Sequence, residues 1–367
     1  MIEKYKDITV VNGKHSIDIL ESNNPMFVCV IAYTETSEIP GITVAGANKD
    51  LIKYTPSADA EFLYYGRCKC IDDVPATPDG KPTPALITKT MLDISNIPFI
   101  VVDSGIQIKP DIPLFSFNLQ SGKNILNDIA MESGEVDKAY RYGLMLGKQL
   151  SKSNDFVILG ESIPGGTTTA LGVMLSLGID AENKMSSSMP ENPHSLKNTI
   201  VRKSMKKNNI TFGSLKDKPF DAISLIGDPM IPSVTGIAQG VIDNGGRVML
   251  AGGTQMCSIL SVLKSINVKT DKVFVGTTKY IFNDPNADFI NLLLSIDKDV
   301  GIFVVDLHLI ESTKLGLKAF ANGFVKEGVG AGGVSIATMI NSNGKLNGET
   351  LLKYIENEYE KNIEKLH

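Results

Sequence analysis

Two glycine-rich segments of the chain each carry a glutamate beside residues suited to binding an anion. In Gly160–Thr169 (GESIPGGTTT), Glu161 precedes the pair Gly165–Gly166. Glycines let the backbone approach a ligand closely, and a helix that begins after them directs N–H groups and a positive dipole end at an anion. With the hydroxyls of Thr167 and Thr168, the segment predicts a phosphate site. A strand-to-helix turn capped by a threonine fits these residues equally well.

The second glutamate lies near the C-terminus, in Lys326–Gly333 (KEGVGAGG). Glu327 precedes four glycines within six residues, so little side-chain bulk separates its carboxylate from a ligand. A carboxylate in an apolar, partly closed site has a raised pKa and can act as a general base near neutral pH. Two structural alternatives stay open: Glu327 lies in a flexible end of the preceding helix, and Glu161 is a carboxylate satisfied near a helix N-terminus.

Short apolar, β-branched runs recur along the chain with helix-length spacers between them. Several are apolar on both faces, which is typical of a mostly parallel sheet covered by helices. We expect a doubly wound, Rossmann-like α/β fold with helices on both faces and a smaller lobe from the chain termini. Ligands of such sheets bind beyond the carboxyl ends of the strands, where Glu161 would lie. The expected strands are 27–33, 99–103, 155–161, 221–228, 247–253, 272–278 and 301–309.

The spacers predict helices over 136–151, 231–243 and 255–265. The tail from Gly348 to His367 predicts an amphipathic surface helix, with an apolar stripe formed by Leu351, Leu352, Ile355, Tyr359 and Ile363. Segments 75–84 and 185–195 are rich in Pro, Ser and Asn and are expected to be loops. The run FLYYG at 62–66 is strand-like.

The composition argues against several classes of protein. The chain has 367 residues, with 36 basic and 41 acidic side chains, and is not basic enough for a general nucleic-acid binder. Its longest apolar run, 27–33, is far shorter than the roughly 18–20 residues that cross a bilayer. The start, MIEKYKDITV, lacks the apolar stretch of a signal peptide, so a cytoplasmic location is expected. The cysteines and histidines show no metal-site spacing, and no metal is predicted.

Taken together, the two glycine-rich segments resemble those of nicotinate-nucleotide:dimethylbenzimidazole phosphoribosyltransferases, and more closely those of their archaeal and cyanobacterial relatives. The family pattern GEMGIGNTT aligns with 160–168, and GEGSGA aligns with 326–331, which places the family's catalytic glutamate on Glu327. A family lysine that reaches the nucleotide phosphate falls on Lys197. An upstream pattern matches Pro84, Thr88 and Met91, followed by VVDSGI at 101–106. The resemblance covers about 84–333.

The resemblance implies a transferase that moves 5-phosphoribose from nicotinate mononucleotide to a ring nitrogen of a benzimidazole-like base. The product would be the α-ribazole phosphate-type nucleotide used as a cobamide lower ligand. Glu327 would take the proton of the base, Glu161 would lie near the ribose, and Gly165–Thr168 with Lys197 would hold the phosphate. The departing ring nitrogen is cationic in the substrate and neutral afterwards, so neither a metal nor a cofactor is implied. A homodimer with small-molecule substrates is expected by analogy.

The chain also departs from the bacterial pattern. Thr90 stands where that pattern has a glutamine that helps line the base pocket, and 251–253 reads AGG in place of DGF. The resemblance implies a base pocket formed by Thr88, Thr90, Met91 and Val325, with the acceptor left open. The expected domains are a divergent N-terminal α/β segment at 1–83 packed on the core, a phosphoribosyltransferase core at 84–342, and a C-terminal helix at 343–367.

Two other functions are alternatives. Asp72 and Asp73, followed by a turn that ends at Gly80, faintly resemble the paired-acid loop that holds Mg²⁺ and the ribose of phosphoribosyl pyrophosphate. A transferase that uses this donor is therefore one alternative. The other is a non-catalytic nucleotide or nucleobase sensor. It would bind phosphate at Gly165–Thr168 but would not use Glu327 in catalysis.

Overall fold

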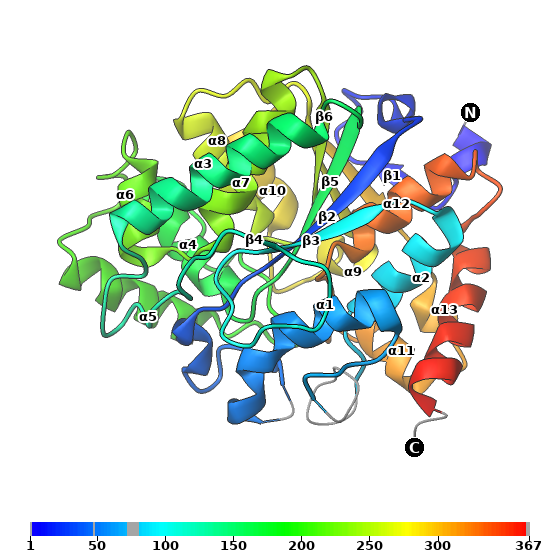
Figure 1. Ribbon diagram of the computed structural model, residues 1–367, viewed down its shortest axis with the longest axis horizontal. Helices are drawn as coiled ribbons and strands as arrows, with labels where there is room; N and C mark the ends of the chain where they lie inside the picture. Colours follow the sequence, from blue (N-terminus) through cyan, green and yellow to red (C-terminus); the bar gives the residue numbers. More distant parts are fainter. Residues whose placement is uncertain (1, 47, 72–80, 365–367) are drawn as a thin grey trace.

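An eight-stranded sheet forms the centre of the computed structural model, which describes residues 2–46, 48–71 and 81–364 (Figure 1). The strand order is β1-β8-β7-β6-β5-β2-β3-β4. β1 pairs antiparallel with β8 at one edge, and all other neighbouring pairs are parallel, so the mostly parallel α/β sheet is confirmed. The strands are β1 (Ile8–Val10), β2 (Pro25–Ile31), β3 (Phe99–Asp103), β4 (Phe115–Ser116), β5 (Phe156–Ser162), β6 (Arg247–Ala251), β7 (Val273–Thr278) and β8 (Gly301–Val305).

The order of the strands reverses between β2 and β5. The chain proceeds from β2 to β3 and β4 in one direction, returns to the other side of β2 with β5, and continues outward through β6, β7 and β8. At this point the register places Glu161 beside Val30 and Ser162 beside Ile31. Helices that follow the two strands leave on different sides there, which opens a crevice beyond their carboxyl ends.

Helices cover both faces of the sheet, and successive side chains of each strand pack alternately against the two layers. In β5, Val157 and Leu159 pack into one hydrophobic cluster, whereas Phe156 and Ile158 pack into the other. The first face carries α3 (Ser133–Leu150), α4 (Gly166–Ser176), α5 (His194–Lys207), α6 (Pro219–Ile226), α7 (Met230–Asp243), α8 (Met256–Ser265) and α10 (Phe289–Ile296).

The second face is covered largely by helices from the two ends of the chain (Figure 1). They are α1 (Thr55–Tyr65), α2 (Ala85–Ser95), α11 (Leu315–Ala321), α12 (Ala331–Asn341) and α13 (Gly348–Asn362). The short helix α9 (Lys279–Phe282) follows β7, and 3-10 helices occur at η1 (Ile2–Tyr5), η2 (Ile17–Leu20), η3 (Glu35–Glu38), η4 (Lys49–Tyr54) and η5 (Leu309–Glu311).

The N-terminal segment contributes to the same sheet as the predicted core. Its strand β2 lies between β5 and β3, and its strand β1 closes the edge beside β8. The C-terminal helix α13 begins at the N-cap Asn347 and buries Leu351, Leu352, Ile355 and Tyr359, so the predicted apolar stripe is confirmed there. The domain boundaries at 83–84 and 342–343 stay predictions.

Two runs predicted as strands are helical. The segment 221–228 falls mostly in α6, where Pro219 starts the helix and Ala222, Ile223 and Ile226 are buried at helical spacing. The run at 62–66 is the last turn of α1 and the residue after it, Gly66, whose φ of +68° ends the helix. A short apolar run is compatible with a buried strand or a buried helix, because either conformation can bury its apolar side chains.

Candidate active site

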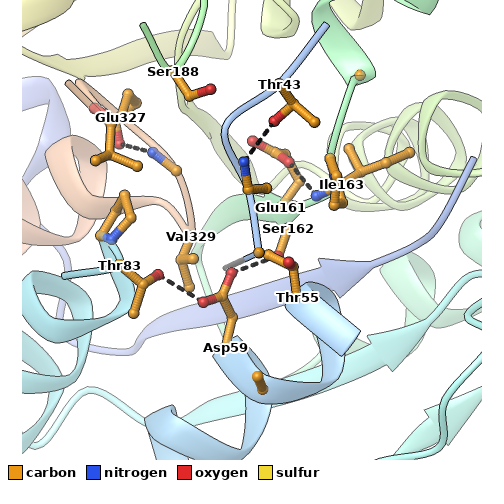
Figure 2. A pocket seen from close by; sticks show the side chains of 18 of the residues that line it. Thr43, Thr55, Asp59, Thr83, Glu161, Ser162, Ile163, Ser188, Glu327 and Val329 are labelled. Carbon is orange, nitrogen blue, oxygen red and sulfur yellow. Dashed lines mark hydrogen bonds between the residues drawn. The ribbon is translucent and has the colours of Figure 1, made fainter. Parts of the chain in front are cut away.

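A cavity of about 950 Å³ opens beyond the carboxyl end of β5, at the point where the strand order reverses (Figure 2). Both ends of the chain contribute to its wall, since α1 and α13 supply lining residues. Its polar lining residues include Asp59, Thr83, Glu161, Ser162, Thr167, Ser186, Ser187, Ser188, Thr254, Gln255 and Glu327. Apolar side chains, among them Ile42, Leu51, Tyr54, Ile281, Val325 and Val329, form much of the rest.

Glu161 lies near the end of β5 and is 5% exposed. Its Oε2 accepts a hydrogen bond from the backbone N–H of Ile163 at 3.0 Å. Burial raises the pKa of Glu161 to about 8, and the neighbouring charges of Asp228, Glu327 and Asp59 act in the same direction against this hydrogen bond. The carboxyl is therefore mostly protonated at neutral pH, and a bound cation would favour its ionised form.

The turn after β5 is built by glycines. Gly165 has a φ of +76° and is the N-cap residue of α4, so the alternative of a threonine cap is wrong. A Cβ on Gly166 would lie 2.6 Å from Oε1 of Gln255, which shows how closely the turn and the β6–α8 loop approach each other. Gly165, Gly166 and Thr167 all line the cavity at the N-terminus of α4, as an anion site requires.

Thr168 and Lys197 lie behind this turn and are not among the described residues that line the cavity. Both are fully buried, and Oγ1 of Thr168 has no hydrogen-bond partner among the described residues. Nζ of Lys197 donates to Oγ1 of Thr167 at 2.8 Å and to the carbonyl of Ser186 at 2.7 Å. Burial lowers the pKa of Lys197 to about 7, with the charge of Lys326 acting in the same direction and that of Asp284 against it. Lys197 thus holds two residues of the cavity wall together.

Glu327 faces the cavity from the turn between α11 and α12. Its Oε1 accepts hydrogen bonds from the N–H groups of Gly328 (3.2 Å) and Gly332 (3.1 Å), and its Oε2 accepts one from Thr278 N–H at 2.9 Å. Burial raises the pKa of Glu327 to about 7, although these hydrogen bonds lower it. At neutral pH the carboxyl is close to half ionised, as a general base should be.

The backbone around Glu327 is strained. Val325 and Val329 have φ values of +44° and +53°, a region that β-branched residues rarely adopt. Gly332 cannot carry a side chain, because a Cβ there would lie 2.3 Å from the carbonyl carbon of Thr277. Strain of this kind persists only where surrounding contacts enforce it, and it clusters at functional sites.

Sequence reasoning missed a buried carboxyl from the N-terminal segment. Asp59 of α1 is 4% exposed and accepts hydrogen bonds from the hydroxyls of Thr83 (2.6 Å) and Ser162 (2.7 Å), as Figure 2 shows. Burial raises the pKa of Asp59 to about 6, against the two hydroxyl hydrogen bonds. The sequence offered only a weak signal, an acidic residue flanked by Ala58 and Ala60, because Ser57 and Glu61 make the same stretch of helix look polar.

A second missed carboxyl, Asp228, lies behind the cavity wall. It is fully buried, and its Oδ2 accepts a hydrogen bond from Thr169 Oγ1 at 2.5 Å, while Oδ1 caps the start of α7 through Met230 N–H at 3.0 Å. Burial raises the pKa of Asp228 to about 6. Asp228 therefore connects the start of α4 to α7 and adds to the negative charge near Glu161.

The residues expected to form the base pocket are only partly brought together. Val325 lines the cavity, whereas Thr88, Thr90 and Met91 are buried in α2 and are not among the described lining residues. Oγ1 of Thr88 donates to the carbonyl of Val329 at 2.9 Å, so this threonine supports the turn next to Glu327 from behind.

Further sequence predictions concern metals and membranes. Among residues 2–46, 48–71 and 81–364, no group of three or more His, Cys, Asp and Glu side chains could hold a metal ion. Within the same ranges, no helix combines the length and the apolar character needed to span a bilayer. The paired acids Asp72 and Asp73 and their turn to Gly80 lie outside the described residues.

Comparison with known sequences identifies relatives along nearly the whole chain. A family model described as a phosphoribosyltransferase matches residues 89–279, just over half of the chain. A UPF0284 protein of Archaeoglobus fulgidus is 43% identical over 96% of this chain and 98% of its own length. A UPF0284 protein of Sulfurisphaera tokodaii is 41% identical over the same shares of the two chains.

Solved structures share the fold at low sequence identity. The chain is similar to the crystal structure of nicotinate-nucleotide-dimethylbenzimidazole phosphoribosyltransferase from Thermus thermophilus, with a TM-score of 0.58, 14% identity, and coverage of 88% of this chain and 84% of that chain. A second structure from the same organism, described as CobT, gives a TM-score of 0.59 at 14% identity, over 89% and 84% of the two chains.

Proposed function

The chain belongs to the phosphoribosyltransferase family, and from that premise we propose that it transfers 5-phosphoribose from nicotinate mononucleotide to a ring nitrogen of a benzimidazole-like base. The product would be an α-ribazole phosphate-type nucleotide for a cobamide lower ligand. The name of the Thermus thermophilus structure motivates the choice of donor and acceptor. A cytoplasmic homodimer, expected from the sequence, stays a prediction.

One observation carries the proposal: two carboxyls with raised pKa values and a glycine turn at a helix N-terminus face the same cavity. Glu327 is held by three backbone N–H groups and keeps a fixed orientation. Glu161 lies at the end of β5, between the sheet and the turn of Gly165–Thr167. The arrangement supports a substrate that has its phosphate at the turn and its ribose near Glu161.

The proposed reaction needs no reactant beyond its two substrates and the side chains of the cavity. The ring nitrogen of the base forms a bond to the anomeric carbon of the ribose, and the bond from that carbon to the pyridinium nitrogen breaks. Its electron pair returns to the pyridine ring, which leaves as nicotinate. The N–H proton of the base passes to Glu327. Ionised Glu161 stabilises the positive charge that develops on the ribose.

Lys197 acts in this scheme as a positioning residue. Its ammonium holds the Thr167 hydroxyl and the Ser186 carbonyl on one side of the phosphate turn. Binding energy from the phosphate, which does not react, is thereby converted into orientation of the anomeric carbon.

The test is release of nicotinate from nicotinate mononucleotide in the presence of a panel of benzimidazoles, followed by chromatography of both products. We expect base-dependent release and a new nucleotide in equal amounts. Transfer from phosphoribosyl pyrophosphate with Mg²⁺, and none from nicotinate mononucleotide, would favour the alternative donor. Binding of nucleotide or base without turnover of either donor would favour a sensor.

Glu327→Gln is the sharpest variant. Because glutamine cannot accept the proton, kcat should fall about 10²–10⁴-fold, with a smaller change in KM. In the wild type, kcat should rise as the pH passes through about 7, since the ionised form of Glu327 is the base. A variant with wild-type kcat would remove Glu327 from the chemistry.

A further inference from the structure

The mechanism above does not use Asp59, although this carboxyl faces the same cavity. Each of its oxygens accepts a hydroxyl hydrogen bond, Oδ1 from Thr83 and Oδ2 from Ser162. A carboxylate can accept about four hydrogen bonds, so capacity is left on both oxygens. Lys81 is the one basic residue among the described lining, and its Nζ lies 3.8 Å from the ring centroid of Phe324.

Burying an ionised carboxylate such as that of Asp59 costs free energy unless hydrogen-bond donors or a cation replace the water that it loses. Among the described residues, no ion pair involves Asp59, and the two hydroxyls are neutral donors. An ionised carboxyl without a cation loses much of its hydration free energy when buried. A hydrogen-bond donor on a ligand would recover part of that loss.

Asp59 lies across the sheet edge from the glycine turn that is proposed to hold the phosphate. Glu161 and Ser162 are successive residues of β5, so their side chains point to opposite faces of the sheet. The phosphate turn begins α4 on the face that Glu161 points to, whereas Asp59 belongs to α1 on the face that Ser162 points to. The phosphate and Asp59 are therefore on different sides of the sheet edge.

A continuous wall joins Asp59 to Glu327. A Cβ on Gly328 would lie 3.3 Å from Pro84 Cγ, so the turn after Glu327 packs against Pro84. Thr83, the residue before Pro84, donates its hydroxyl to Asp59. Glu327, Gly328, Pro84, Thr83 and Asp59 thus follow one another along a wall of the cavity. A flat ring with one edge at Glu327 would lie along this wall, with another edge toward Asp59.

We propose that Asp59 accepts a hydrogen bond from the acceptor base, so that the acceptor is a bicyclic heteroaromatic ring with a hydroxyl or amino substituent remote from the attacking nitrogen. This inference rests on the proposed function and specifies its substrate class. It also assigns a function to the N-terminal segment, because Asp59, the group that would distinguish acceptors, belongs to α1.

The experiment compares 5-aminobenzimidazole and 5-hydroxybenzimidazole with 5-methylbenzimidazole as acceptors for the wild type, D59N and the control D137N. Asp137 is an exposed residue of α3 that does not line the cavity. We expect the wild type and D137N to prefer the donor-bearing bases by about 10–100-fold in kcat/KM, the usual range for a hydrogen bond to a charged group. In D59N this preference should fall to within about 3-fold, and KM for nicotinate mononucleotide should not change.

Two results would overturn the inference: an unchanged preference in D59N, or a D59N effect confined to KM for the nucleotide, which would indicate a ribose contact. Measuring the binding of the three bases by calorimetry distinguishes failure of the inference about Asp59 from failure of the proposed function. If no base is turned over, the wild type should still bind the amino and hydroxy compounds more tightly than the methyl compound, and D59N should not. Equal binding of all three by the wild type would overturn the inference.

Discussion

At the scale of single residues, acidic groups whose pKa values burial raises lie in the wall of the cavity and directly behind it. Glu161, Glu327, Asp59 and Asp228 come from four different segments, and each is held by hydrogen bonds from backbone N–H groups or hydroxyls. At neutral pH Glu161 and, in part, Glu327 therefore carry protons, which a nearby positive charge would displace. This arrangement would suit the pyridinium nucleotide that we propose as the donor, whose positive charge would be lost when the ring departs.

The raised pKa of Glu161 predicts a pH-dependent cost in stability. An unfolded glutamate ionises near pH 4.3, whereas folded Glu161 keeps its proton until about pH 8. Between these values the folded state binds more protons, so this group lowers the free energy of unfolding as the pH rises. E161Q should match the wild type near pH 4.5 and exceed its stability at pH 8.5 by about 1–3 kcal/mol. Denaturant titrations at the two pH values test this, and equal differences at both would contradict it.

At the scale of elements, the backbones of α3 and α7 are in close contact on the first face of the sheet. α3 and α7 pack through small residues: a Cβ on Gly147 would lie 2.2 Å from the carbonyl oxygen of Ile237, and one on Gly236 would lie 2.2 Å from that of Tyr140. The backbones therefore approach more closely than any side chain permits. α7 begins at the residues capped by Asp228, so this packing also fixes one wall behind the site.

G147A should destabilise the protein by about 2–3 kcal/mol, because the new methyl group forces α3 away from α7. Gly134 provides a control in the same helix, since a Cβ there meets nothing within 4 Å. G134A should leave stability unchanged or raise it by up to about 1 kcal/mol, through the better helix propensity of alanine. Thermal or denaturant unfolding measures both. Similar changes in stability for G147A and G134A would show that the close contact between α3 and α7 does not cause the loss in G147A.

At the scale of the whole molecule, a buried ion pair connects segments that are far apart in the sequence. Lys326 Nζ lies 2.9 Å from Asp284 Oδ2, and both side chains are almost fully buried. The same ammonium donates to the carbonyl of Met189 at 2.8 Å, while Asn192 donates to Asp284 at 3.0 Å. The ion pair and these two hydrogen bonds thus connect the loop at 185–195 to Lys326, the residue next to Glu327.

D284N should destabilise the protein by about 3–5 kcal/mol, because it leaves the ammonium of Lys326 buried without a counter-charge. The double variant D284N/K326M should recover part of this loss, since the uncompensated charge is gone. D180N, in the exposed pair with Lys184, should cost less than about 1 kcal/mol. A double-mutant cycle on unfolding free energies checks the coupling, and additive single effects would exclude it.

Local pattern was sufficient to predict some of this structure. The strands at 27–33, 99–103 and 247–253 and the helix at 136–151 were predictable, because periodicity, length and flanking residues agree there. The run at 221–228 was not, because a short apolar segment can bury its apolar side chains in either conformation, and only packing against α4 and α3 selects the helix. Secondary structure was thus predictable where a helical apolar stripe, or the length of a run and the turn residues at its ends, distinguished one conformation from the other.

The sequence by itself determined the two glutamates, the glycine turn and the sheet class, because strand-end glycines and acidic residues leave a local signature. Only the tertiary structure decided which distant groups join them. It placed Asp59 of the N-terminal segment in the cavity, Lys197 behind Thr167, and Thr88, Thr90 and Met91 behind the wall. The physical reason is that a cavity is formed by packing between elements, and neither the direction of a side chain nor its neighbours are encoded within a few residues of it.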